Sequence, residues 1–286
     1  MSTSEHPTPG PTMDTTAARG PYASAHLHTL WLEHPLLERP ALAAAHGFSA
    51  VDLWWPFEGP DPDDAEVEAL ARAIEAAGLT VVSMNADGGD LPGGDRGFAC
   101  DPDQQDRFRR AVTSGIDVAV RLGGPNLNVL YGNRPADGSV AEQDVLAHEQ
   151  LTWATRTAAA RGVQVVLEAL NDTDTPRYPI NTTAQALAVI EAVALECDLG
   201  FLFDQYHLAI MGDDLTAAFR RSREAVRHVQ IADVPGRHEP GTGQVDIPGF
   251  LAMLAAEGYA GAVGLEYFPA GRTEDGLGWL DGVLRR

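Results

Sequence analysis

Four short apolar runs decide the fold: VQVVLEA at residues 163–169, LGFLFD at 199–204, HVQIAD at 228–233 and GAVGLEY at 261–267. Each run carries a candidate acidic or amide side chain in its second half or at its centre, and these side chains are Glu168, Asp204, Gln230 and Glu266. Successive polar residues are separated by about one strand-plus-helix repeat. Short apolar runs that alternate with longer segments of helical period predict parallel strands joined by helices.

The same alternation extends toward the N-terminus, where four further runs are ASAHLH at 23–28, AVDLWW at 50–55, TVVSMN at 80–85 and NLNVLY at 126–131. The segments between the runs predict helices at 35–46, 63–77, 103–122, 141–161, 182–196, 215–226, 248–257 and from 273 onward. Eight repeats in about 265 residues predict a single α/β domain, a (β/α)8 TIM barrel over residues 21–286. An open doubly wound sheet is the alternative, but AHLHTLWLEH at 25–34 lacks the glycine fingerprint usual after its first strand.

The net charge and the absence of lysine exclude several classes of function. The chain has 286 residues, 44% of them hydrophobic, and a formal net charge of −21. Such a surface would repel phosphate backbones, so nucleic acid is not expected as a partner. All 20 basic residues are arginine, which excludes Schiff-base aldolases, pyridoxal enzymes and Walker-type phosphate loops because each needs a lysine.

The sequence also predicts where the protein resides. Residues 1–20 are rich in Pro, Ser, Thr and Gly and lack the features of a secretory signal, so we expect a disordered tail. No apolar run approaches the roughly 20 residues that span a bilayer, which predicts a soluble protein with no membrane partner. The two cysteines, Cys100 and Cys197, form no C-x-x-C pair, so we expect neither a zinc ribbon nor a disulfide framework, and a cytoplasmic location.

The polar residues of the last four runs converge on one mouth if the barrel is right. Three carboxylates in a low-dielectric pocket would repel one another unless a cation lay between them. A ligand set made only of oxygen atoms favours Mg²⁺ or Mn²⁺ over zinc, which prefers Cys or His. Glu168, Asp204, Gln230 and Glu266 are therefore the expected metal ligands; alternatively, each is a buried polar residue that caps neighbouring backbone.

Two long loops after strands, 86–102 and 233–247, are candidate substrate lids. Arg237 and His238 lie in the second loop, where the arginine could bind a substrate carboxylate, although such a triplet with Glu239 is equally typical of a solvated loop. His207, three residues after Asp204, would reach back over the mouth as a substrate ligand, or it is an ordinary core or surface histidine.

The first half of the chain offers weaker candidates. Asn85 and Asn128 end the third and fourth runs and could bind substrate oxygens or simply terminate strands. Trp54 and the aromatic residues after it could form an apolar wall for a ligand, pack between barrel and helix, or contact another subunit. Asp52 could be a further polar barrel residue, whereas His228 belongs to no pattern.

The chain resembles the hydroxypyruvate isomerase family of xylose isomerase-like barrels from about His26 to its end. The motifs that carry the resemblance are VLEAL around Glu168, the D-x-x-H of residues 204–207, HVQIADVPGRHEP at 228–240 and GLEYFPAGRTEDGLGWLD at 264–281. The resemblance implies that Glu168, Asp204, Gln230 and Glu266 bind one divalent metal. It also implies that the two glutamates handle the substrate proton and that His207 and the Arg237–Glu239 loop contact the substrate.

The expected activity is a metal-dependent isomerisation of aldose–ketose type, from hydroxypyruvate to tartronate semialdehyde through an enediolate, with Glu168 and Glu266 as acid and base. Asn128, Tyr131 and Phe268 depart from the family pattern, which leaves an isomerase or 3-epimerase of a larger keto sugar or specialised metabolite as an alternative. A metal-dependent hydrolase resembling apurinic-site endonucleases and a non-catalytic binding barrel are further alternatives. The expected partner is a small keto acid or sugar, and barrels of this group often form homo-oligomers.

Overall fold

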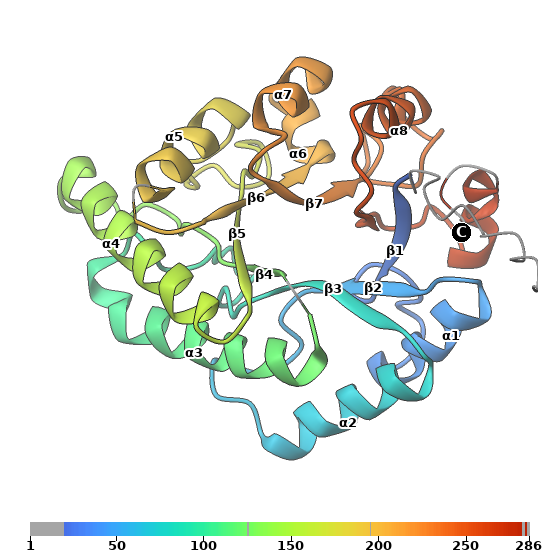
Figure 1. Ribbon diagram of the computed structural model, residues 1–286, viewed down its shortest axis with the longest axis horizontal. Helices are drawn as coiled ribbons and strands as arrows, with labels where there is room; N and C mark the ends of the chain where they lie inside the picture. The colour runs from blue at the N-terminus through green and yellow to red at the C-terminus, as the bar shows by residue number, and fades with distance from the viewer. Residues whose placement is uncertain (1–19, 125, 195, 282–283, 285–286) are drawn as a thin grey trace, which may run out of the picture.

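A closed barrel of eight parallel strands forms the centre of the molecule (Figure 1). The computed structural model describes residues 20–124, 126–194, 196–281 and 284. Neighbouring strands pair in chain order, and β1 pairs with β8 to close the sheet. The strands are β1 (Tyr22–His26), β2 (Ala50–Leu53), β3 (Thr80–Asn85), β4 (Asn126–Asn128), β5 (Gln164–Glu168), β6 (Gly200–Asp204), β7 (Val226–Ile231) and β8 (Ala262–Leu265). The predicted TIM barrel is confirmed, and the eight apolar runs are its strands.

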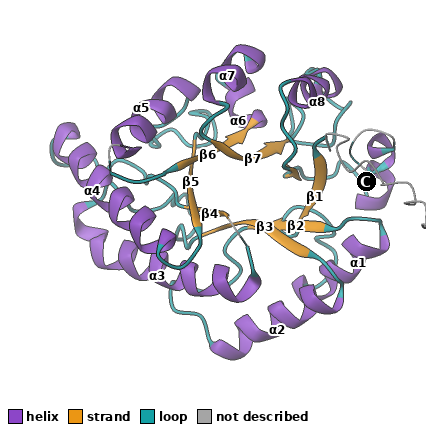
Figure 2. Ribbon diagram, in the orientation of Figure 1, coloured by secondary structure: helices purple, strands orange, loops and turns teal. Residues whose placement is uncertain are grey.

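Helices surround this barrel (Figure 2). They are α1 (Arg39–Ala45), α2 (Asp64–Ala76), α3 (Gln105–Leu122), α4 (Val140–Ala159), α5 (Thr183–Ala194), α6 (Gln205–Ile210), α7 (Leu215–Ser222) and α8 (Ile247–Ala256). Side-chain caps fix several helix starts, because an unpaired amide in the first turn needs an acceptor. Asp63 accepts a bond from the Ala65 amide at 2.8 Å, and Asp214 accepts one from the Ala217 amide at 3.0 Å.

The structure corrects the helix predictions in three places. The segment 35–46 opens with a 3-10 turn, η1 (Leu36–Glu38), because Pro40 has no amide to donate to the Leu36 carbonyl. Helix α6 follows β6 directly and was not predicted, since six residues are too few to show a helical period. After β8 the described residues form two 3-10 turns, η3 (Thr273–Gly276) and η4 (Gly278–Leu280), where a helix was predicted; Gly276 and Gly278 both disfavour a continuous helix.

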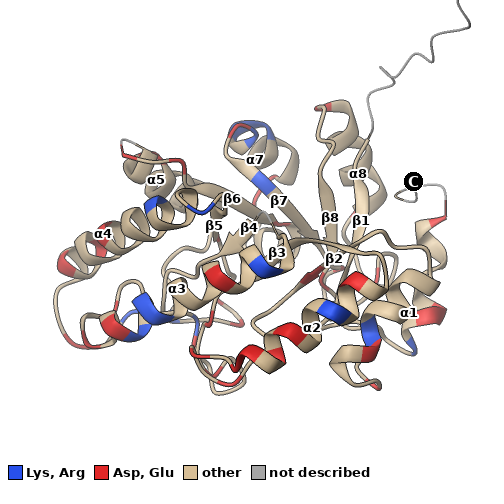
Figure 3. Cartoon of the chain, turned by 60° about the horizontal axis from the view of Figure 1, so that its bottom comes forward, with Lys and Arg blue, Asp and Glu red and all other residues tan. Residues whose placement is uncertain are grey.

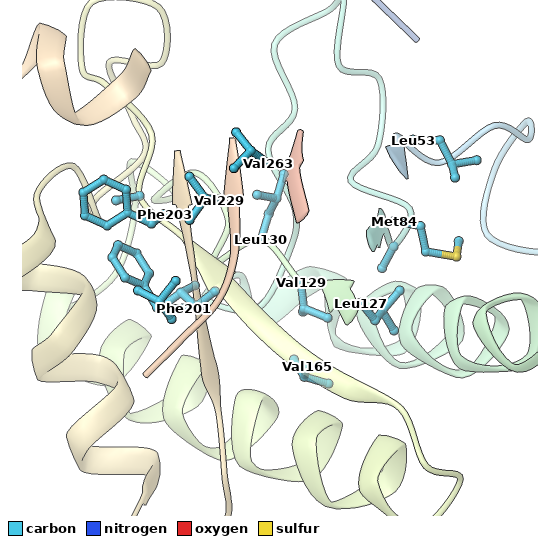
Figure 4. Close-up of a cluster of buried hydrophobic side chains, with 14 of the residues drawn as sticks. Leu53, Met84, Leu127, Val129, Leu130, Val165, Phe201, Phe203, Val229 and Val263 are labelled. Atoms are coloured by element: carbon cyan, nitrogen blue, oxygen red, sulfur yellow. The ribbon is translucent and has the colours of Figure 1, made fainter. Parts of the chain in front are cut away.

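The main hydrophobic core lies between the barrel and its helices (Figure 4). Side chains alternate along each strand, so every second residue faces outward toward a helix. Phe203 on β6 shows this, since it stacks on Phe250 of α8 at 5.8 Å between ring centroids and meets Phe219 of α7 edge-on. Its neighbours Leu202 and Asp204 are therefore left for the barrel interior and mouth.

Charged residues are spread along the helices that surround the barrel (Figure 3). Arg121 of α3 bridges Glu68 and Glu75 of α2, with N–O distances of 2.8 and 2.6 Å, and the bonds from Arg121 and Arg72 lower the pKa of Glu68 to about 2. Exposed ion pairs of this kind contribute little to stability. The helices are therefore held on the barrel mainly by apolar contact.

Two expectations concern the ends and the exterior of the chain. The predicted disordered tail, residues 1–20, lies outside the described residues except for Gly20. Within the part of the chain that the structure describes, every helix is too short or too polar to cross a bilayer.

Candidate active site

A cavity of about 420 Å³ lies where the strands end. Its polar lining includes Glu168, His207, Arg237 and Glu266. The apolar part of its lining consists of Trp54, Leu91, Pro92, Leu130, Leu170 and Phe268. Glu168 is the last residue of β5, and Glu266 directly follows the last residue of β8. The cavity is thus at the C-terminal ends of the strands, where TIM barrels place their active sites.

Three carboxylates lie close together at this cavity, and all are buried: Glu168, Asp204 and Glu266. Burial, together with the charges of Glu266 and Asp204, raises the pKa of Glu168 well above its usual value. Burial and the Glu266 carboxylate likewise raise the pKa of Asp204 to about 7. The repulsion expected from the sequence is therefore present, and a cation among these groups would relieve it.

Two oxygen atoms at this cluster test whether a metal fits. Asp204 Oδ2 and Gln230 Oε1 are buried, and neither accepts a hydrogen bond from any described residue. Asp204 and Glu168 also place carboxylate oxygens within 4.8 Å of each other and of a His207 nitrogen. A buried oxygen without a partner costs free energy unless an ion or ligand uses it. The donor set therefore fits a divalent cation that prefers oxygen.

A buried network below the cavity orients Gln230. Its Nε2 donates to Asp52 Oδ2 at 3.3 Å, which leaves Oε1 free. His228 Nε2 lies 3.1 Å from the same carboxylate oxygen. Although burial opposes it, bonds from His228 and Gln230 and the nearby His26 lower the pKa of Asp52 below its usual value. Asp52 thus stays charged inside the barrel and fixes the amide, as outer partners of metal ligands commonly do.

Glu266 is held by three side chains from different segments. Trp54 Nε1 donates a short hydrogen bond to Oε1, and His26 Nε2 lies 3.6 Å from the same oxygen. Arg237 donates to Oε2 at 2.9 Å and also lies 3.6 Å from Asp204 Oδ2. Both oxygens of Glu266 are therefore pre-positioned at the cavity.

Glu168 is oriented by an asparagine from the neighbouring strand β4. Asn128 Nδ2 donates to Glu168 Oε2 at 2.6 Å and also to Asn85 Oδ1 at 3.2 Å. Asn128 is buried and does not line the cavity, so it positions Glu168, whereas Asn85 lines the cavity.

His207 presents a hydrogen-bond donor to the site. The Asn171 amide donates to His207 Nδ1 at 3.1 Å, and a backbone N–H can only donate, so Nδ1 is the acceptor. Burial, followed by the charges of Arg237 and Arg96, lowers the pKa of His207 well below its usual value, so the ring is neutral. The proton is therefore on Nε2, which lies 3.6 Å from Asp204 Oδ2 and 3.9 Å from Glu168 Oε1. In this tautomer His207 is suited to bind a substrate oxygen rather than a metal.

The loop 233–247 is fixed by Asp233. Its carboxylate accepts backbone bonds from four residues of the loop, namely Val234, Gly241, Gly243 and Val245, at 2.8 to 3.1 Å. Arg237 adopts a left-handed conformation with φ of 55°, and its amide donates to the Asp233 carbonyl. Such strain persists only where surrounding contacts over-determine it. His238 Nδ1 lies 2.6 Å from the Phe268 carbonyl and His238 does not line the cavity, so it ties the loop to the segment after β8.

Sequence reasoning missed several residues at this site. Arg96 and Asp174 line the cavity from loops, where no strand spacing singles them out. His228 belongs to no pattern in the sequence, yet it is two residues before Gln230 on β7, and this spacing places both on the barrel-interior face. Tyr131 departs from the family pattern, but its hydroxyl donates to Asp144 of α4 at 2.6 Å and it does not line the cavity.

Comparisons with known proteins agree with this geometry. Residues 40–283 match the family model described as "Xylose isomerase-like TIM barrel". A Streptomyces coelicolor protein named "Putative hydroxypyruvate isomerase" is 45% identical over 268 residues, covering 92% of this chain and 96% of the relative. The 2-oxo-tetronate isomerase of Cupriavidus necator is 36% identical, with 93% and 100% covered. A crystal structure titled AP endonuclease, family 2, from Brucella melitensis superposes with a TM-score of 0.83 at 32% identity, covering 91% of this chain and 98% of that one.

Proposed function

The chain belongs to the xylose isomerase-like TIM barrel family and is an isomerase, and from this premise we propose that it interconverts hydroxypyruvate and tartronate semialdehyde with a bound Mg²⁺ or Mn²⁺. The two substrates in the names of these relatives, hydroxypyruvate and 2-oxo-tetronate, are both 2-oxo acids. The single observation that carries the metal dependence is the pair of buried oxygens on Asp204 and Gln230 that accept no hydrogen bond from a described residue, beside two further carboxylates.

Glu168, Asp204, Gln230 and Glu266 would hold the cation. When bound, it would act as a Lewis acid that polarises the substrate carbonyl and lowers the energy of a neighbouring carbanion. The oxygen-only set disfavours a zinc-dependent hydrolase, because zinc prefers nitrogen and sulfur ligands and His207 uses its lone-pair nitrogen for the Asn171 amide.

The two glutamates then move the proton between carbons. Glu168 and Glu266 come from β5 and β8, so they reach the cavity from different parts of the barrel rim. One removes a proton from the hydroxyl-bearing carbon to give an enediolate, and the other delivers a proton to the former carbonyl carbon, while the hydroxyl proton passes to the second oxygen. In this proposal His207 Nε2–H donates to a substrate oxygen during the exchange.

A longer 2-oxo acid is a second candidate substrate. The cavity of about 420 Å³ lies in the size range that accommodates drug-sized ligands, well above the need of a three-carbon acid. Asp174 and Thr175 add polar groups to the lining on the side of the β5–α5 loop. These features favour a polyhydroxy acid such as 2-oxo-tetronate over hydroxypyruvate alone.

Proton NMR in D₂O tests the proposal. Cation-stripped protein should leave hydroxypyruvate unchanged, and added Mg²⁺ or Mn²⁺ should give tartronate semialdehyde with deuterium incorporated at carbon. Glu266→Gln and Glu168→Gln should each lower kcat by at least about 100-fold, since general acid–base catalysis contributes roughly 10²–10⁴-fold. Glu191→Gln, on the exposed face of α5, is the matched control. Wild-type turnover in both glutamine variants would refute their roles.

A further inference from the structure

The cavity contains a second arginine, Arg96, which the mechanism above does not use. It comes from the loop after β3, and one terminal nitrogen donates to the Leu91 carbonyl at 2.8 Å and to the Asp95 carbonyl at 2.6 Å. These two bonds hold the guanidinium in place. Its other donors reach no acceptor, and no carboxylate lies within ion-pair distance, among the residues that the structure describes.

Arg237 is less available than Arg96 to bind a substrate carboxylate. Its guanidinium is paired with Glu266 at 2.9 Å and lies 3.6 Å from Asp204, and its Nε donates to the Glu266 carbonyl at 3.3 Å. It also lies over the Tyr206 ring, 4.8 Å from the centroid. A substrate carboxylate that competed for Arg237 would leave buried acids unpaired, which is strongly unfavourable.

Arg96 is close enough to the reacting groups to act on a ligand there. Arg96 and His207 both line the cavity, together with Glu168 and Glu266. Burial and the charge of Arg237 lower the pKa of Arg96 itself, while Glu168 and Asp174 oppose that shift. Leu91 and Pro92 from the same loop line the cavity as well. A half-buried guanidinium with open donors matches the fork geometry of a carboxylate.

We propose that Arg96 binds the carboxylate of the substrate and makes the enzyme selective for 2-oxo acids over neutral keto sugars, an inference that depends on the proposed isomerase function for its substrate class. The remaining N–H groups of Arg96 donate hydrogen bonds to the substrate carboxylate, while the carbonyl and hydroxyl carbons of the substrate face Glu168 and Glu266. The substrate carboxylate thereby pairs with the guanidinium of Arg96, and the ion pair between Arg237 and Glu266 is left undisturbed.

Kinetics with hydroxypyruvate provide the first test. Arg96→Gln should raise KM by roughly 10- to 100-fold with a much smaller change in kcat, because a hydrogen bond to a charged group is lost. Arg96→Lys keeps the positive charge but loses the planar guanidinium. Its KM should therefore lie between those of wild type and Arg96→Gln. The control is Arg110→Gln on α3, an exposed arginine that pairs with Asp61 outside the cavity. Unchanged KM in Arg96→Gln would overturn the assignment while leaving the proposed function intact.

Binding of unreactive ligands separates the two proposals. Isothermal titration calorimetry of Mg²⁺-loaded protein would compare glycerate with glyceramide, which has the same skeleton but no charge. We expect wild type to prefer glycerate by at least about 10-fold, and Arg96→Gln to lose this preference while glyceramide binding persists, which also shows that the loop is intact. If wild type fails to convert hydroxypyruvate but shows this pattern, the substrate is wrong and the carboxylate site stands. Equal preference in wild type and Arg96→Gln would refute the site.

Discussion

Asp204→Asn should stabilise the cation-free protein at neutral pH, although it alters a candidate metal ligand. The substitution keeps the oxygen that accepts the Tyr206 amide at 2.8 Å and removes one charge from the buried carboxylates. In wild type, burial and Glu266 raise the pKa of Asp204 from 3.8 to about 7. The folded chain therefore holds this proton to higher pH than the unfolded chain does, and folding becomes less favourable as the pH rises through that window.

The size of the effect follows from the same pKa. A rise from 3.8 to about 7 corresponds to roughly 4 kcal/mol of folding free energy lost above pH 7, as an upper limit. At about 2 °C per kcal/mol for a chain of this size, the variant should unfold up to about 8 °C higher than wild type. Below about pH 4 both states bind the proton, so the two proteins should unfold at the same temperature.

Thermal unfolding followed by circular dichroism checks this at about pH 4 and about pH 8, with a chelator or with excess Mn²⁺. Added Mn²⁺ should narrow the difference, since a ligand at 100 times its Kd stabilises wild type by about 2.7 kcal/mol and the variant has lost a ligand. Asp172→Asn, an exposed carboxylate in the loop after β5, is the control and should show neither effect. A lower Tm for Asp204→Asn than for wild type in chelator at about pH 8 would refute the reasoning.

Three further substitutions test the surroundings of the site. Gly264→Ala would drive a methyl group into the Asp52 carboxylate and to 2.9 Å from Gln230 Cγ, so we expect a loss of about 1–3 kcal/mol in urea unfolding. Asp52→Asn should weaken Mn²⁺ binding by about 10- to 100-fold, measured by calorimetry, and unchanged affinity would contradict its role in orienting Gln230. Tyr131→Phe should leave KM and kcat unchanged in steady-state assays, because its hydroxyl binds Asp144 outside the cavity.

The barrel could be predicted because the alternation of short apolar runs with segments of helical period can be seen locally in the sequence. Each apolar run is a strand, and the polar residues at the ends of β5 to β8 fall at one rim because parallel strands share a direction. Helix α6 and the 3-10 turns after β8 were not predictable in the same way. They are short, and capping and glycine content decide them rather than any repeat.

The candidate site was predictable mainly where its residues lie at a strand end or a few residues after one. Glu168, His207 and Glu266 follow from strand ends, whereas Arg96 and Asp174 come from loops whose paths depend on tertiary contacts. Spacing also cannot reveal which arginine is already paired. Arg237 was a candidate for the substrate carboxylate, yet in the structure it is bound to Glu266.

The expected metal ligands lie on one half of the barrel and most of the side chains that orient them lie on the other half. This arrangement has a consequence for folding. All four expected metal ligands lie in or directly after β5 to β8. Three of them are oriented by side chains from β1 to β4 or the loop after β2, namely His26, Asp52, Trp54 and Asn128, and Glu266 is also held by Arg237 from the loop after β7. Asp52 and His228, which meet below Gln230, are 176 residues apart in the chain. Contacts of such long range form late, because a long loop must close first. Cation affinity should therefore report barrel closure, and separately expressed halves should acquire it only on association.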